Sequence, residues 1–148
     1  MTWTRALLSG LAEHLAASGA GVWHPNGIYA SNEIAITIGG LPAAPDTALT
    51  LAVYGVGPGG DDPTEPDSQV LVQARIRAGQ DPRIVDDLAD SVFGALHGLS
   101  DMVLDGGVLL LQALRTVVAP LGVDGSGRWE RADSYSIRVH RPSTHRPG

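Results

Sequence analysis

Cysteine, lysine and long apolar runs are all missing from this sequence of 148 residues. Without cysteine the chain can form neither disulfides nor a thiolate metal site, and nothing in it requires an oxidising compartment. No apolar run approaches the roughly 20 residues that span a bilayer, and Glu13 and His14 interrupt the N-terminal stretch that a secretory signal would need. We therefore expect a soluble protein, made in the cytoplasm, without membrane contact.

Lysine is absent, so all ten basic side chains are arginine, which is typical of a GC-rich genome. The formal net charge is −6. General affinity for nucleic acid comes from clustered cations that release phosphate counterions, so an acidic chain is a poor candidate for it. The overall charge therefore argues against DNA as a specifically bound ligand.

Hydrophobic periodicity predicts one helix, three strands, a second helix and two strands. The predicted helices cover residues 4–18 and 81–98, and the predicted strands cover 33–38, 49–56, 69–76, 108–118 and 129–140. This order cannot supply repeated strand-helix-strand units. We therefore expect an α+β fold with a mostly antiparallel β-sheet, two helices packed on one face and a long acidic hairpin loop.

The second helix has the clearest boundaries in the sequence. Asp81 can cap the first-turn amides, Pro82 stands where its missing N–H costs nothing, and Gly98 can close the other end. Its expected core face consists of Ile84, Val85, Leu88, Val92 and Leu96. We expect residues 1–142 to form a single domain and residues 143–148, which directly follow Pro142 and contain Pro147, to be an exposed C-terminal tail or an arm ordered by a neighbour.

The segment GVGPGG, residues 55–60, has the glycine content of a phosphate-binding turn. Such a turn needs a helix directly behind it, whereas here DDPTEPDSQ follows, whose prolines cannot start that helix and whose carboxylates repel phosphate. The acidic residues also lack the spacing of a calcium-binding loop. The segment therefore begins a flexible acidic loop whose carboxylates are Asp61, Asp62, Glu65 and Asp67.

No constellation of residues indicates catalysis or metal binding. The histidines are His14, His24, His97, His140 and His145. They never occur as His-x-His or His-x-x-x-His, the spacings typical of paired metal ligands. There is no Gly-x-Ser-x-Gly motif, and DGSGRWE, residues 124–130, is first of all a hairpin turn. We expect no enzyme activity, no cofactor and no metal.

The arginines carry more information because they share strand faces. Arg75 and Arg77 lie opposite the apolar side chains of their strand, and Arg138 and His140 alternate with apolar residues on the last strand. This polar face is either an ordinary solvated surface or a subunit contact, in which arginines pair with carboxylates of the 61–67 loop or of the second helix. The candidate interface residues are Arg75, Arg77, Arg115, Arg138 and His140.

The second half of the chain combines several features in a particular order. They are the strand 72–77, the helix end Leu96-His97-Gly98, the turn Pro120-Leu121-Gly122-x-Asp124, the segment 127–130 and the strand 134–137. Together they resemble the minor capsid or tail terminator family of long-tailed bacteriophages. The resemblance covers residues 68–142, and the first helix fits the family's organisation more loosely.

The resemblance implies a non-enzymatic virion protein of the tail-neck region. Members of that family form a ring, typically a hexamer, which caps the completed tail tube, stops polymerisation and offers a surface for the head. The implied partners are copies of the chain, the major tail tube protein, head-tail connector proteins, and DNA that passes through the lumen without specific binding. The 61–67 carboxylates would then face the lumen or the tube-facing rim.

Two other functions stay open at this point. One is a head-completion or connector protein of the neck, bound on the portal side. The other is a small α+β ligand-binding domain or enzyme that uses a cleft near His97 and the glycine-rich loop, with Asp61 and Asp124 as polar groups. The absence of a clustered acid, base or nucleophile makes the tail terminator hypothesis the preferred one.

Overall fold

The computed structural model describes residues 2–147. Its elements follow the order α1 (Trp3–Ala17), β1 (Val22–Trp23), β2 (Ala35–Ile38), β3 (Ala48–Val56), β4 (Asp67–Arg77), α2 (Pro82–Leu96), β5 (Ser100–Val103), β6 (Leu109–Val123) and β7 (Trp129–His140). The two predicted helices and the five predicted strands, which correspond to β2, β3, β4, β6 and β7, are confirmed. No helix within residues 2–147 combines the length and apolar character needed to cross a membrane.

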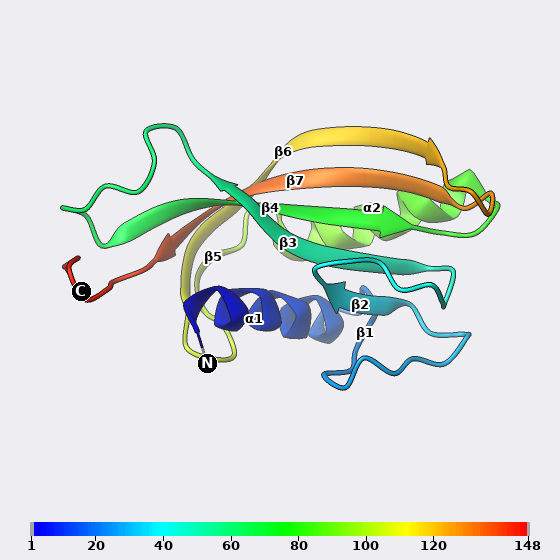
Figure 1. Ribbon diagram of the computed structural model, residues 1–148, viewed down its shortest axis with the longest axis horizontal. Coiled ribbons are helices and arrows are strands. Elements are labelled where there is room, and N and C mark those ends of the chain that lie inside the picture. Colours follow the sequence, from blue (N-terminus) through cyan, green and yellow to red (C-terminus); the bar gives the residue numbers. More distant parts are fainter. Residues whose placement is uncertain (1, 148) are drawn as a thin grey trace.

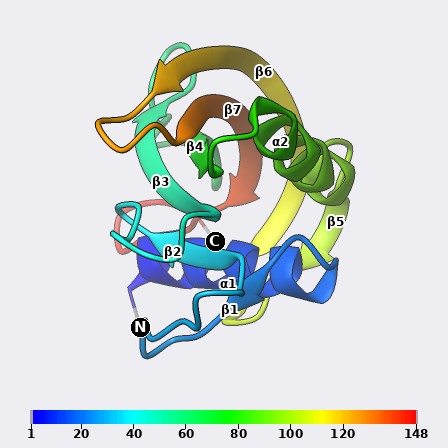
Figure 2. The ribbon, with the colours of Figure 1, turned by 90° about the vertical axis from the view of Figure 1, so that its right-hand side faces the viewer.

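All strands belong to one sheet with the order β1-β2-β3-β4-β7-β6-β5. β1, β2 and β3 pair in parallel, and every other neighbouring pair is antiparallel. The four long strands β3, β4, β7 and β6 form the centre of the sheet, which curls strongly when viewed along the molecule (Figures 1 and 2). The expected α+β fold with a mostly antiparallel sheet is therefore confirmed in outline.

Both helices contribute to one hydrophobic core on the same side of the sheet. Leu7, Leu11 and Leu15 of α1 are fully buried, as the helical spacing predicts. From the sheet, Val70, Val72, Ala74 and Ile76 of β4 and Tyr135, Ile137 and Val139 of β7 join the same core. Alternate residues of each long strand thus pack against the helices, and the residues between them point to the opposite side of the sheet.

The ends of the helices are formed as the sequence indicates. The Asp81 side chain accepts a hydrogen bond from the Arg83 amide at 3.0 Å, and Pro82 opens α2. Gly19 and Gly98, directly beyond the two helices, adopt positive φ angles of 84°.

The expected core face of α2 was wrong at one position. Ile84 is 42% exposed, whereas Ala89 is fully buried and completes the stripe with Val85, Leu88 and Val92. Ile84 lies one residue, or about 100° around the helix, from Val85, so its side chain points away from the centre of the buried stripe.

Three predictions about strands also need correction. β1 and β5 were missed because they have only two and four residues and no apolar alternation. β6 continues to Val123, whereas the predicted strand ended at residue 118, before Pro120. The strand accommodates Pro120 because its register to β7 shifts between Pro120 and Gly122. In and just before β2, the apolar residues Ile34, Ile36 and Ile38 alternate with Glu33, Ala35 and Thr37 in the sequence, which predicts one buried face; adjacent Ala35 and Ile36 are nevertheless both buried.

Candidate assembly surface

The side chains that point away from the helices form a second surface, called here the outer face. Its members follow from the register, because residues paired across neighbouring strands share a face. From β3 through β4 and β7 to β6, the rows are Thr50-Arg75-Ala132-Ala119, Ala52-Gln73-Ser134-Val117 and Gly55-Leu71-Ser136-Leu114, and a shorter row is Gln69-Arg138-Gln112. The middle of this face is uncharged, and its small side chains Ser134 and Ser136 are only 7% and 5% exposed.

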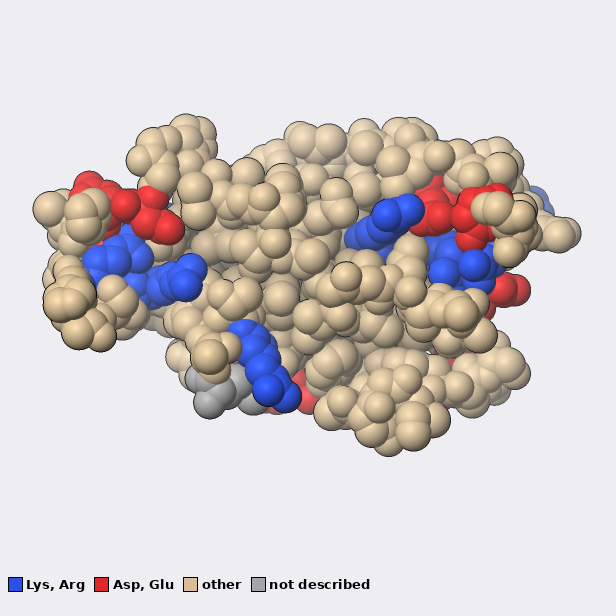
Figure 3. All heavy atoms as spheres, in the orientation of Figure 1, with Lys and Arg blue, Asp and Glu red and all other residues tan. Residues whose placement is uncertain are grey.

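Charged groups on the outer face gather toward its two ends. Figure 3 shows most of the Arg, Asp and Glu side chains near the two ends of the long axis, with a mainly uncharged surface between them. At one end the Arg75 Nε donates to Glu130 Oε1 at 2.8 Å. At the other end the carboxylate of Asp67 lies 3.9 Å from the Arg138 guanidinium and 3.1 Å from His140 Nδ1.

Arg77 differs from the other candidate interface residues because it is only 3% exposed. Its guanidinium donates to the backbone oxygens of Pro45 at 2.7 Å and of Asp46 at 2.9 Å. Burial, and then the nearby charge of Arg128, lower the pKa of the Arg77 guanidinium. Arg77 therefore holds the 45–46 segment against the sheet and has no free donor face to offer a partner.

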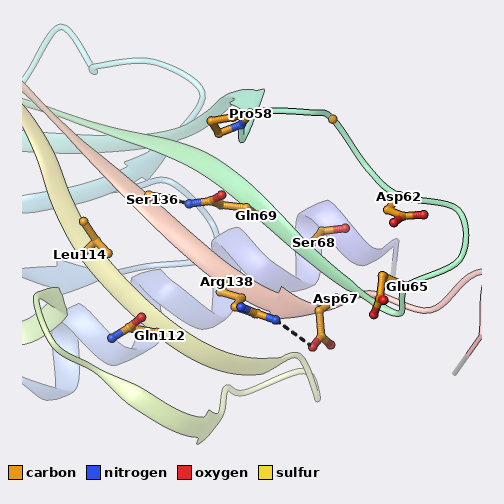
Figure 4. A pocket seen from close by; sticks show the side chains of 11 residues that line it. Pro58, Asp62, Glu65, Asp67, Ser68, Gln69, Gln112, Leu114, Ser136 and Arg138 are labelled. Atoms are coloured by element: carbon orange, nitrogen blue, oxygen red, sulfur yellow. Dashed lines mark hydrogen bonds and ion pairs between the residues drawn. The ribbon is translucent and has the colours of Figure 1, made fainter.

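The Asp67 end contains an open depression between the 57–66 segment and the strands (Figure 4). Its floor carries Gln69, Ser136 and Arg138 of the outer face, and Pro58, Asp62 and Glu65 line its wall. The Gln69 amide donates to the Ser136 hydroxyl across the two strands. The lining is hydrophilic and mixed in charge, which suits contact with polar protein surface better than an apolar ligand.

Two glycines and one set of side-chain hydrogen bonds shape the acidic loop. Gly59 and Gly60 adopt positive φ angles of 85° and 72°, which let the chain turn where a side chain would strain it. Asp62 accepts hydrogen bonds from the hydroxyl and the amide of Thr64, and these bonds lower the pKa of its carboxyl group. The carboxylates of Asp61 and Glu65 make no ion pair within residues 2–147.

Arg146 joins the C-terminal segment to this loop. Its guanidinium donates to the backbone oxygens of Asp62 at 3.0 Å and Asp67 at 2.9 Å, and to the Ser68 hydroxyl at 2.7 Å. No local sequence pattern indicates this contact, because the partners are 78 to 84 residues apart. The segment beyond β7 thus lies against the acidic loop at the same end of the outer face.

Arg115 lies apart from the other candidate interface residues, beside α2. Its guanidinium stacks over the Phe93 ring at 4.3 Å and lies 3.5 Å from the carboxylate of Asp133. Asp133 is fully buried and also accepts from Arg131 at 2.8 Å. The structure therefore does not bring Arg115 together with Arg75 and Arg138.

The buried charges on the helix side were missed in the sequence, although a signal was present. Arg131 and Asp133 fall on the same alternation as Tyr135 and Ile137, which places them on the core side of β7. Burial, and then the charge of Asp133, raise the pKa of Tyr135 to about 12. This buried ion-pair network ties β7 to α2, because Arg131 also donates to Asp86 at 3.0 Å.

The histidines are distributed over the fold. His97 Nδ1 accepts from the Arg115 amide, and His24 pairs with Glu33 at 2.9 Å. Within residues 2–147, no three His, Asp or Glu side chains come close enough together to hold a metal ion. Asp124 accepts hydrogen bonds from the amides of Arg128 and Ser126, as expected for a turn residue rather than a ligand.

Comparison with solved structures finds the same fold in a chain of the "Virion of native gene transfer agent (GTA) particle". The TM-score is 0.63 and the sequence identity 16%, over 95% of this chain and 99% of that chain. No curated protein sequence matches the chain.

A comparison with protein-family models assigns the chain to a family. The model described as "Bacteriophage tail terminator protein" matches residues 14–141, which includes both helices in part or whole and the entire sheet. The match extends further than the resemblance noted over residues 68–142, because it also covers the first half of the chain. The chain therefore belongs to the bacteriophage tail terminator protein family.

Proposed function

We propose that this protein forms a ring on the end of the completed tail tube, stops tube polymerisation and provides the surface to which the head is joined. Family membership over residues 14–141 is the observation that carries the proposal. The role is structural, so binding surfaces rather than a reaction site carry it. The proposed partners are copies of the chain, the major tail tube protein and head-tail connector proteins in the tail-neck region of the virion.

The outer face supports this proposal because it is an extended surface that no helix covers. Four long strands contribute to it, and charged side chains stand at its two ends, on either side of an uncharged centre whose small side chains are largely buried. The exposed charged side chains at its two ends can form ion pairs that fix the orientation of a partner. Arg75 and Arg138, which are 48% and 65% exposed at their side chains, are the proposed contacts, together with His140.

The acidic loop is proposed to lie at the lumen or at the tube-facing rim of the ring. Asp61 and Glu65 are exposed and free of ion pairs within residues 2–147. At a lumen, these carboxylates would repel DNA phosphates and let the DNA pass without binding. At the rim, they would pair with arginines of a neighbour.

Deletion of the gene in the phage that encodes it tests the function. We expect tails of abnormal length, measured by electron microscopy, and restoration of uniform length when the wild-type gene is supplied in trans. A variant with Asp61 and Glu65 replaced by Asn and Gln then tests the loop, with DNA delivery and tail length as separate readouts. Tails of normal length beside unjoined heads would contradict the terminator role and indicate a neck connector instead.

A further inference from the structure

The two outer edges of the long-stranded sheet remain partly open. β2 pairs with Ala48–Leu51, which leaves residues 52–56 of β3 with no backbone hydrogen bond except to β4 within residues 2–147. On the opposite side, β5 pairs with β6 only up to Gln112, and His97 accepts from the Arg115 amide. From Thr116 to Val123, β6 has no backbone partner except β7 in the described chain.

Both open edges carry exposed apolar side chains. Of the eleven exposed large hydrophobic residues among residues 2–147, five lie on β6, four of them in its open stretch, and two lie on the open part of β3. They are Leu114, Val117, Val118, Leu121 and Val123 on β6, and Tyr54 and Val56 on β3, each between 38% and 54% exposed. Neither residues 52–56 nor residues 116–123 contain a charged side chain. Natural edge strands in monomers usually carry such charges, because an uncharged apolar edge invites pairing with another chain.

We propose that the open β6 edge of one copy packs against the open β3 edge of the next copy, head to tail around the ring. This inference deepens the proposed function by naming the surface through which the ring closes. Two different apolar edges on one chain fit a heterologous contact, whereas a two-fold dimer would need only one of them. The occupant of each edge is therefore a second copy of this chain.

The strand directions are compatible with this contact. β3, β4, β7 and β6 alternate in direction, so β6 of one copy would lie antiparallel beside β3 of the next and continue the pattern of the sheet. β2 covers the first half of β3, and β5 with His97 covers the first half of β6. β3 and β6 run in opposite directions, so their covered halves lie at opposite ends of the sheet. If two neighbouring copies are shifted along the strand direction, the open half of β6 in one copy lies beside the open half of β3 in the next.

Side chains rather than a long hydrogen-bonded ladder supply most of this contact. Pro120 has no N–H to donate, and β6 is irregular between Arg115 and Val117 and between Pro120 and Gly122. Hydrogen bonds across the contact are therefore confined to a short stretch, while Val117, Val118 and Leu121 meet Tyr54 and Val56 of the next copy.

Cross-linking tests the contact cleanly because the natural chain has no cysteine. The full-length double variant Val117→Cys with Tyr54→Cys is treated with a short bismaleimide, both in concentrated solution and on tail tubes from a deletion phage. We expect a ladder of covalent multimers that ends at a closed ring, and no multimers from either single variant. A dimer from Val117→Cys alone, or no ladder under both conditions, overturns the proposal.

A charge variant gives a second readout. Adding Val117→Lys to a cross-linking pair placed at Val118 and Tyr54 should lower the multimer yield roughly tenfold or more, because a lysine there would be buried without a partner. Ile28→Lys, at a more exposed apolar residue outside both edges, is the matched control and should leave the yield unchanged.

The edge contact and the capping function can fail separately. A ladder formed by a protein that does not limit tube length supports the edge contact while contradicting the function. Conversely, if wild-type protein limits tube length and Val117→Lys limits it equally well, the proposed function stands and the edge contact is wrong.

Discussion

The two faces of the same four strands have opposite character. On the inner face, Val72, Tyr135 and Ile137 are fully buried under α1 and α2. On the outer face, the polar residues Gln73, Ser134 and Ser136 alternate with them; Gln73 is partly exposed, and the small Ser134 and Ser136 are 7% and 5% exposed. The inner face finds its partners within its own chain, so its packing stabilises the fold. The outer face is left for partners outside the chain, which is consistent with assembly into a larger structure.

The first prediction compares adjacent residues on opposite faces of β7. Ile137→Ala should lower the free energy of unfolding by about 2–5 kcal/mol, because it removes fully buried methyl groups and leaves a cavity. Arg138→Ala, at an exposed side chain, should change it by less than about 0.5 kcal/mol. Urea denaturation of both variants measures the difference. Equal losses would mean that the outer face is as important for folding as the inner one.

The second prediction concerns Arg77, which is an exception to the contrast between the two faces. Arg77 is on the outer side of β4 but is buried, with its guanidinium bonded to the carbonyls of Pro45 and Asp46. Arg77→Ala should therefore destabilise the fold by about 1–3 kcal/mol, because it leaves these carbonyls without their donors. Arg75→Ala is the control on the same strand face, since the exposed Arg75–Glu130 pair should contribute less than about 1 kcal/mol. Similar stability of both variants would contradict a structural role for Arg77.

The third prediction, with the smallest effect, uses pH at the β6–β7 turn. Hydrogen bonds from the Arg128 amide, and then from Ser126 and the Arg128 side chain, lower the pKa of Asp124 from 3.8 to about 2. A depressed folded-state pKa means that the stabilisation by this carboxylate is present above pH 4 and is lost as the pH falls toward 2.

Thermal melting of the wild type and Asp124→Asn between pH 7 and pH 2 measures this contribution. The wild type should be the more stable protein at pH 5–7, and the difference should shrink below pH 4. Ser126→Ala removes no titrating group and serves as the control, with a difference that does not follow this pH range. A difference that grows on acidification would show that the charge of Asp124 does not stabilise the turn.

Much of the fold could be predicted from the sequence because local patterns report directly on burial. The alternation Val70, Val72, Ala74 and Ile76 identified the core side of β4, and Asp81 with Pro82 marked the start of α2. Short strands escaped detection, since two residues in β1 cannot establish a period. The same limit explains β5, which is held in the sheet by pairing with β6 rather than by its own pattern.

The candidate surface was less predictable because its contacts join distant parts of the chain. The arginines were expected to act as one group, yet Arg77 is buried, Arg115 lies beside α2, and Arg138 remains exposed. Sequence spacing gives the side of a strand on which a residue lies, but not which segment covers it. The packing of the 45–46 segment over Arg77, and of Arg146 against the acidic loop, required the folded chain.

By itself, the sequence determined the fold class, the two helices, five of the strands and the resemblance to phage tail terminators. These depend on local periodicity, end signals and motif order, all of which are written along the chain. Only the tertiary structure decided which strands lie at the edges of the sheet, where coverage of β3 and β6 stops, and which arginines remain free. Those properties depend on strand order and on contacts between residues far apart in sequence, which no local pattern specifies.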